Sequence, residues 1–527
     1  MGMHGEESRS RLPASQKKII TKLLERRQIE AELQGLLAAG SEPALHRQAQ
    51  EIAARGSQVI PAIMGNLDRA DARMLAALGI VAALLDHEEV SAALRQVILQ
   101  PHFSDRGRIG AMTILERFLG QPPDEDLLVA LSDPEGVAIS SLEEVLSQAE
   151  SNPAVLIEYV QGLDQQEPDV VLGVTRALRD MEKSSVHRRE RVIEPLRMMA
   201  QDVREEIAGE ALRALGAIRL PGAAMALQTL IPISAPGLRP TAERLLRKQQ
   251  FSGVEVVPLP PPPPAWRALI GTVSGRGQQH VWFVERDQQR SQARFLSVLL
   301  NDQVGAAEAV GHAQVPLLML PPQRPLGHVH DVALPDGSGA VLMLEASFDL
   351  GRRRVLAALD ANRETQIPVA VVLRLLCPWL WGYAGADALP EQQVPDCHPG
   401  DEAHTERLLR HPAFVTWTAR SDALLAASTE VARHPGWDPE VWVKRLAGEL
   451  FGEPAVARIF GRRLLDMGEW LMLAGEVDLS CLALVAAQAI QKGDPRDQPF
   501  VQALIRRDLE LVLLGLMQTP EPLFDAE

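Results

Sequence analysis

Cysteine is scarce in this chain, with three residues among 527: Cys377, Cys397 and Cys481. Three cysteines cannot all pair, and none of them stands in the CxxC spacing that structural zinc sites and redox motifs use. A fold stapled by disulfides is therefore excluded. We expect a protein of a reducing compartment, the cytoplasm.

Lysine is also rare, with seven residues against 46 arginines, and none lies between Lys248 and Lys444. That stretch can hold no P-loop lysine, no Schiff-base lysine and no nuclease lysine paired with carboxylates. The sequence also lacks a GxGxxG fingerprint and a GxSxG elbow. We predict no cofactor, and a non-enzymatic protein is the favoured interpretation, although the sequence leaves catalysis open.

Long apolar runs are missing as well. The first fifteen residues are polar and charged, and no signal peptide is expected there. The most apolar segment, 367–386, carries Arg374 and is broken by Pro368, Pro378 and Gly382. Because a charge within a membrane span is costly, we predict a buried helix here and no membrane span.

What is present is the composition of an ordinary folded protein: 46% hydrophobic and 23% charged residues. At about 150 residues per domain, the length indicates three or four domains. The chain holds 69 acidic and 53 basic residues, a net charge of -16. Such a balance repels a phosphate backbone unless basic residues gather on one face, so the charge disfavours nucleic acid as a partner.

Composition changes near Pro258. All eight tryptophans follow Ala265. Just before it, the run Pro258 to Pro264 holds six prolines, which lack N–H donors and so exclude helix and strand. The sequence predicts an N-terminal helix over 1–40 that caps the repeats, helical repeats over 41–250, a proline-rich linker over 251–265, a small α+β domain over 266–366, and a C-terminal helical region over 367–527.

Before the linker, similar apolar helical blocks recur. Their starts, at residues 71, 105, 137, 168, 203 and 237, are separated by 34, 32, 31, 35 and 34 residues. That spacing predicts one helical hairpin per repeat. Small residues within the apolar faces, among them Ala77, Ala111 and Ala211, would let neighbouring hairpins approach closely.

Two segments resemble parts of a known repeat. Val59 to Leu67 resembles the second helix of a HEAT unit, and Val203 to Leu220 resembles the first helix. Residues 42–250 are therefore similar to the HEAT and armadillo-like family of α-solenoids. The resemblance implies a concave surface that binds another macromolecule. No family is recognised for residues 266–527.

After the linker the hydrophobic period changes to two. Short strands are predicted over 267–273, 280–284, 294–300, 315–320 and 340–345, with turns at 274–277 and 335–339, and a helix is predicted over 348–364. From residue 367 onward the pattern is helical without a repeat. The predicted fold class is mainly α: an N-terminal HEAT-like α-solenoid, a small α+β domain and a C-terminal non-repeating helical bundle.

Metal-ligating residues are few. His328 and His330 would share one face of a strand about 7 Å apart, with Asp331 pointing the other way, so one ion would need a further ligand from elsewhere. These three are the nearest candidates, yet we predict no metal and interpret the histidines as hydrogen-bonded residues at a strand edge. A second loose group, Cys397, His398, His404 and His411, is interpreted as surface residues.

The favoured functional hypothesis is a non-enzymatic scaffold or adaptor that binds another protein or peptide along the HEAT-like repeats. One alternative is an enzyme whose site lies between the α+β domain and the C-terminal helices. The other is a HEAT-like nucleic-acid-binding protein, which would need arginines of several repeats aligned in one stripe.

Overall fold

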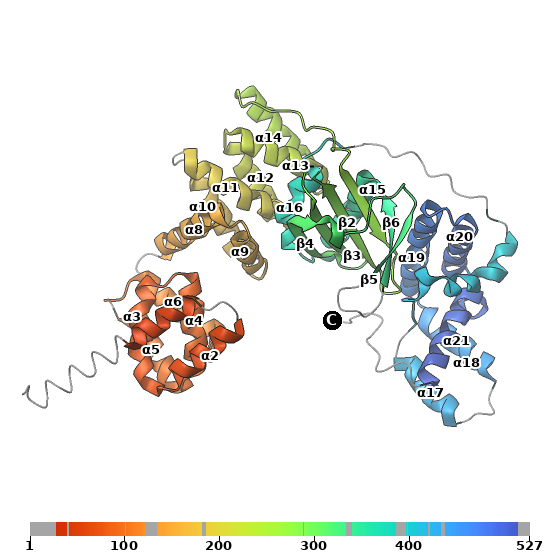
Figure 1. The fold of residues 1–527 in the computed structure, drawn as a ribbon, viewed down its shortest axis with the longest axis horizontal. Coiled ribbons are helices and arrows are strands. Elements are labelled where there is room, and N and C mark those ends of the chain that lie inside the picture. The colour runs from red at the N-terminus through yellow and green to blue at the C-terminus, as the bar shows by residue number, and fades with distance from the viewer. Residues whose placement is uncertain are drawn as a thin grey trace, which may run out of the picture. The chain divides into compact units, whose positions relative to one another are not determined.

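The computed structural model describes residues 28–38, 42–100, 102–121, 134–181, 186–287, 289–333, 340–385, 397, 399–419, 422–433 and 438–514. These residues are mainly helical and include one six-stranded antiparallel sheet (Figure 1). The chain divides into two compact units, Met1–Glu144 and Val145–Glu527. The predicted boundaries at residues 250 and 266 do not coincide with this division.

The first unit is built of short helices around one apolar core. Its elements are η1 (Leu36–Ala38), α2 (Glu42–Ala53), η2 (Gly56–Val59), α3 (Ile60–Asn66), η3 (Leu67–Arg69), α4 (Ala72–Ala83), α5 (His87–Leu99) and α6 (Asp105–Arg117). Helix starts are capped by short polar side chains: Asp71 accepts from the backbone N–H of Met74 at 2.7 Å, and Ser104 caps α6. Of the predicted capping helix, residues 1–27 lie outside the described part, whereas Ile29 and Leu33 are buried in this core.

The second unit begins with further helices. They are α8 (Pro134–Ser151), which contains the boundary between the units, α9 (Val155–Asp164), α10 (Pro168–Asp180), α11 (Val186–Met199), α12 (Glu205–Ala217), α13 (Pro221–Leu230), η5 (Ile231–Ile233) and α14 (Arg239–Phe251). The six predicted block starts each lie within three residues of the first residue of α4, α6, α8, α10, α12 or α14. The period read from the sequence thus identifies the helices correctly.

Helices that are two apart along the chain pack side by side. Helix α12 packs between α10 and α14, and α11 packs between α9 and α13. Small residues allow this close approach, as predicted: Ala77, Ala111 and Ala211 are buried, and a Cβ added to Gly216 on α12 would come within 2.5 Å of Leu245 on α14. These helices of the second unit therefore form two layers, α10–α12–α14 and α9–α11–α13.

Residues 254–263 form neither helix nor strand, as the prolines require. This linker is held by hydrogen bonds at two points. Gln228 donates to the carbonyl of Val257 at 3.1 Å, and the N–H of Ala384 donates to the carbonyl of Pro260 at 2.8 Å. The linker is therefore attached to the helices and to the region that follows the sheet.

The sheet has the strand order β4-β3-β2-β1-β6-β5, with every pair antiparallel. Its strands are β1 (Trp266–Gly271), β2 (Gln278–Arg286), β3 (Gln292–Asn301), β4 (Gly305–Pro316), β5 (Val329–Ala333) and β6 (Ala340–Ala346). The strand predicted over 315–320 is wrong, because β4 ends at Pro316 and Leu317–Met319 is a 3-10 turn, η6. The turn predicted at 274–277 is present, while the one at 335–339 lies outside the described residues.

Helices α15 (Phe348–Thr365) and α16 (Val371–Trp381) pack against the sheet. Gly351 brings α15 close to the β1 and β2 strands, since a Cβ there would come within 2.8 Å of Phe283 and Ala268. Gly311 of β4 is similarly close to Leu376 of α16. On its other side α16 packs against α9, α11 and α13, so it lies between the sheet and one helical layer.

The C-terminal region contains η7 (Pro399–Arg410), η8 (Pro412–Phe414), α17 (Asp422–Arg433), α18 (Pro439–Phe451), α19 (Pro454–Leu473), α20 (Val477–Lys492), η9 (Pro495–Asp497) and α21 (Pro499–Leu513). Aromatic rings form its core: Trp417 lies 6.0 Å from Phe460 and 5.9 Å from Phe500, both edge-on. The indole N–H of Trp470 on α19 donates to the carbonyl of Ile270 in β1 at 2.9 Å, which attaches this region to the sheet.

Candidate binding surfaces

Polar contacts connect successive helical hairpins at a recurring chain separation. The Ser104 hydroxyl donates to Asp68, 36 residues earlier, at 2.7 Å in the first unit. In the second unit Gln249 donates to the carbonyl of Leu215, 34 residues earlier, at 2.8 Å. Each contact spans about one period of the predicted repeat, so neighbouring hairpins are held by hydrogen bonds as well as by apolar packing.

On the α10–α12–α14 layer the connection is an ion-pair network. Glu210, nearly buried, accepts from Arg179 of the preceding hairpin at 2.6 Å and pairs with Arg213 of its own helix at 2.8 Å. Glu210 is mostly shielded from water, while both arginines reach the surface. The network therefore connects neighbouring helices of the layer and leaves the solvent side of the layer exposed.

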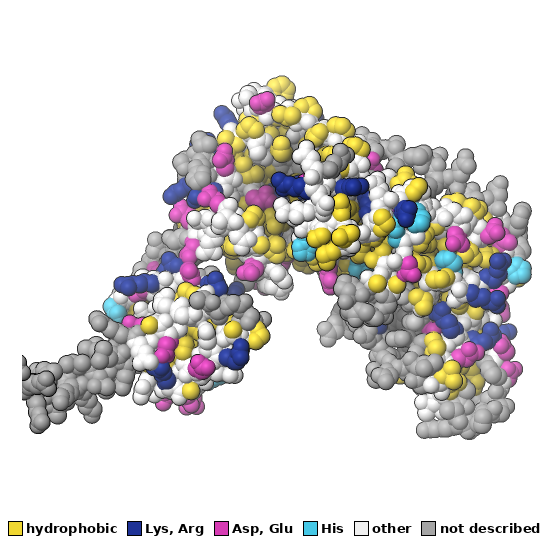
Figure 2. All heavy atoms as spheres, viewed as in Figure 1, with side chains coloured by type: hydrophobic (Ala, Val, Ile, Leu, Met, Phe, Trp, Pro, Cys, Tyr) yellow, Lys and Arg dark blue, Asp and Glu magenta, His cyan; other side chains and the backbone are white. Residues whose placement is uncertain are grey.

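The solvent side of this layer carries charges of both signs. Its exposed charged residues lie seven apart on α10 (Asp169 and Arg176) and on α12 (Glu206 and Arg213), and three apart on α14 (Arg244 and Arg247). Within the described part of the chain, the side chains of Arg176 and Arg247 make no hydrogen bond or ion pair. On the face of the molecule seen in Figure 2, acidic and basic side chains are likewise interspersed.

The α9–α11–α13 layer is occupied by α16. The guanidinium of Arg374, which is 1% exposed, reaches across to both carboxylate oxygens of Asp164 on α9, at 3.0 and 3.1 Å. Its third nitrogen donates to the carbonyl of Val369 at 3.0 Å. Burial raises the pKa of Asp164, and the neighbouring Arg374 opposes that rise. This bidentate pair fixes the sheet region to the helical layer.

A second buried arginine, on α11, also contacts α16. Arg197 of α11 donates to the Sγ of Cys377 at 2.5 Å and to the carbonyl of Arg374 at 2.9 Å. Burial raises the pKa of the Cys377 thiol, although Arg197 opposes this. Gln201 also donates to the carbonyl of Arg374, at 2.9 Å. The helical layer therefore recognises α16 through its backbone carbonyls as well as through its side chains.

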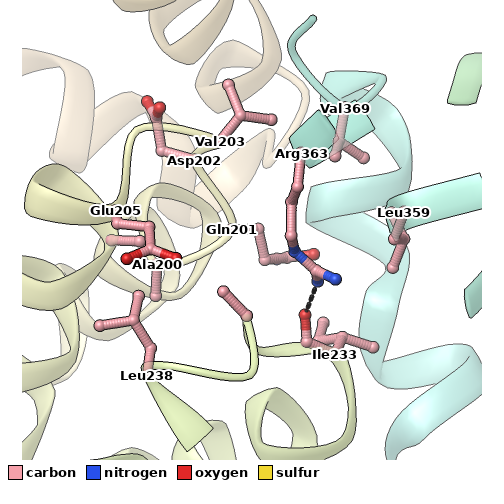
Figure 3. A pocket seen from close by; sticks show the side chains of 12 residues that line it. Ala200, Gln201, Asp202, Val203, Glu205, Ile233, Leu238, Leu359, Arg363 and Val369 are labelled. Atoms are coloured by element: carbon pink, nitrogen blue, oxygen red, sulfur yellow. Dashed lines mark hydrogen bonds between the residues drawn. The ribbon is translucent and has the colours of Figure 1, made fainter. Parts of the chain in front are cut away.

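A small cavity lies beside this contact, between the helical layers and α15 (Figure 3). Asp202 and Glu205 line one wall, and Arg363 of α15 enters from the other and donates to the carbonyl of Ile233. Burial lowers the pKa of Arg363, and Asp360 opposes the shift. Its interior takes little more than one water molecule, so we interpret it as a packing gap and not as a ligand site.

A larger hollow, of about 540 Å³ and open to solvent, lies at the end of the β2–β3 hairpin. Arg286, Arg290 and Arg294 line it together with two carboxylates. Arg294 pairs with Glu285 at 2.7 Å, and Arg290 lies 4.0 Å from Asp287. Because the carboxylates offset two of the three guanidinium charges, the hollow has little excess positive charge to attract an anion.

The metal candidates occupy an edge of the sheet. His330 lies buried on β5, and its Nε2 is 2.9 Å from Glu345 of β6. Glu345 also accepts from Arg267 of β1 at 2.7 and 3.0 Å. Both carboxylate oxygens of Glu345 therefore contact protein groups, and His330 is hydrogen-bonded to the carboxylate of the Arg267–Glu345 ion pair.

His328 and Asp331 do not join that network. His328 precedes β5 and is exposed, with its ring 4.8 Å from the ring of His330, and Asp331 is exposed on the strand. The second histidine group is also dispersed: His411 contacts Glu476 at 3.3 Å, His404 is exposed, and His398 lies outside the described residues. Among the residues that the structure describes, no group of three metal-ligating side chains converges.

The seam between the sheet and the C-terminal helices, which is the site of the alternative enzyme hypothesis, is filled by large side chains. Trp417 and Trp470 are essentially fully buried there and donate to the carbonyls of Val273 and Ile270 at 2.9 Å. Arg463, 1% exposed, forms a bidentate pair with Asp302 at 2.6 and 3.0 Å. These groups satisfy one another and leave no donor of theirs aimed at a substrate.

Sequence reasoning missed the role of Arg374, although the residue was conspicuous as the one charge within an apolar run. Such a residue signals a buried partner, yet its partner Asp164 lies 210 residues away and gives no local sign. Within the described residues, no helix is both long enough and apolar enough to span a membrane. Comparison of the chain with protein-family models and with curated proteins finds no match.

Proposed function

We propose that this chain is a non-enzymatic scaffold of the HEAT-like, α-solenoid kind, which binds another protein or peptide through its helical repeats in the cytoplasm. Support comes from the regular spacing of the hairpins, from the packing of helices two apart along the chain, and from the contacts between hairpins at one period.

One observation carries the proposal: the α9–α11–α13 layer already holds an apolar helix, α16, by side-chain packing and by hydrogen bonds to its backbone. Helix-in-groove binding is a common mode of protein recognition. Since this layer is occupied within the chain, the partner binds the solvent side of the α10–α12–α14 layer. Its mixed charges suit a protein partner better than a phosphate backbone.

The test is affinity purification with the full chain and with the double variant Arg176→Glu, Arg247→Glu. Both side chains are exposed and make no contact that the fold needs, so the variant folds while the charge pattern of the layer is reversed at two points. A specific protein partner is expected with the parent chain, and recovery falls about 10-fold or more with the variant.

The matched control is Arg324→Glu, an equally exposed arginine in the loop after η6, which leaves recovery unchanged. Loss of the partner with Arg324→Glu but not with the double variant places the binding surface elsewhere. Recovery of salt-resistant nucleic acid in place of a protein contradicts the proposal.

A further inference from the structure

Two of the three cysteines meet in the C-terminal region. The Sγ of Cys397, just before η7, lies 2.7 Å from the Sγ of Cys481 on α20, although 84 residues separate them. Both are thiols in the structure. A disulfide bond has an S–S length of about 2.05 Å, so only a small movement of the side chains separates this pair from a covalent bond.

The surroundings differ between the two sulfurs. Cys397 is half-buried and therefore reachable from solvent, whereas Cys481 is buried, at 8% exposure. Reversible redox cysteines commonly combine an accessible thiol, which reacts first, with a second thiol close enough to resolve the product. The third cysteine, Cys377, is fully buried against Arg197 and takes no part.

We propose that Cys397 and Cys481 form a reversible oxidation site that takes a two-electron oxidant of the peroxide class. The Cys397 thiolate attacks one peroxide oxygen, the O–O bond breaks, and a sulfenic acid forms while the second oxygen leaves as water after taking a proton. The Cys481 thiolate then attacks the Cys397 sulfur, the S–O bond breaks, and a second water leaves. In total two thiols lose two electrons and two protons, and one peroxide becomes two waters.

The bond would close a loop of 84 residues between the start of η7 and α20. These elements already pack together, and η7 also contacts α21. A bridge between packed elements restricts the unfolded chain without straining the folded one, and long loops gain most. Oxidation therefore locks η7 onto the bundle, whereas reduction leaves the two held by non-covalent packing.

The experiment treats the purified, reduced full chain with hydrogen peroxide and counts thiols after denaturation. The expected count falls from the three of the reduced chain to about one as a single disulfide forms. The intact mass drops by about 2 Da, and digestion yields one peptide pair joined through Cys397 and Cys481. Dithiothreitol restores the starting mass, and the bridge raises the melting temperature by about 5 °C.

Cys397→Ser is the informative variant, because its half-exposed position tolerates the change. After peroxide treatment this variant forms no intramolecular bridge, and its melting temperature does not rise. Cys377→Ser still forms the bridge. Sulfinic acid at Cys397 beside an intact Cys481 thiol, a dimer of chains linked through Cys397, or three unreacted thiols would each overturn the proposal.

Discussion

Arg374 concentrates much of the interaction between α16 and the helical layer. It is buried and pairs with Asp164 through two hydrogen bonds, and its own backbone carbonyl accepts from Arg197 and Gln201. A buried ion pair of this kind is expensive to break, because removal of one partner leaves the other charged and desolvated.

Arg374→Met is accordingly expected to lower the free energy of unfolding by about 3–5 kcal/mol, measured by urea denaturation at neutral pH. The cost should shrink as the pH falls. Without Arg374, the main group that opposes the burial effect on the pKa of Asp164 is gone and only the weaker attraction of Arg204 remains. The folded variant therefore binds a proton more tightly than the unfolded chain does, and protonation stabilises it.

The double variant Arg374→Met, Asp164→Leu removes both charges and should recover most of the lost stability, whereas Arg506→Met, in an exposed pair with Glu440, should change little. A double variant as unstable as Arg374→Met would mean that the arginine acts through its packing and not through the ion pair.

Helices are where sequence and structure agree best. The repeat starts and the helical character of the C-terminal region are readable because apolar periodicity is local. Pro439 and Pro454 stand in the first turns of α18 and α19, where proline is favoured. Strand β4 is missed because its Gly305–Pro316 segment is rich in alanine and glycine, so no apolar alternation marks it. Strand β4 is held in the sheet by its pairing with β3, and such a tertiary interaction leaves no local pattern in the sequence.

The contact between α12 and α14 gives a prediction about these layers. Gly216→Ala introduces a methyl group that would come within 2.5 Å of Leu245, and the overpacking should lower the free energy of unfolding by about 1–3 kcal/mol. The measurement is denaturant unfolding of the full chain.

Gly173→Ala is the matched control in α10, since no heavy atom lies within 4 Å of the added carbon. There the better helix propensity of alanine should raise stability by up to about 1 kcal/mol. Equal effects of the two substitutions would mean that α12 and α14 do not approach as closely as described.

Taken whole, the chain joins its parts in a way that composition could not reveal. Tryptophan content and the proline run mark residue 258 as a boundary. In the structure, however, α9, α11 and α13, which precede the linker, pack against α16, which follows it. One compact unit spans residues 145–527. Composition reports on each segment alone, whereas the pairs Asp164–Arg374 and Arg197–Cys377 join residues 210 and 180 apart.

The binding surface follows from that arrangement. With one helical layer filled by α16, we propose that the partner binds the solvent side of α10, α12 and α14, and that the sheet and the C-terminal helices hold the layers in place. A bound partner slows hydrogen exchange of the backbone that it covers. The location of the slowed peptides therefore distinguishes binding on α10, α12 and α14 from binding on the second half of the chain.

The measurement is hydrogen exchange of the full chain, alone and in complex with the protein that affinity purification recovers, followed by mass spectrometry of its peptides. We expect slower exchange on binding in peptides that cover α10, α12 and α14, with β1 to β6 unchanged. Slower exchange confined to residues 266–346 or to the C-terminal helices, with α10, α12 and α14 unaffected, would contradict it.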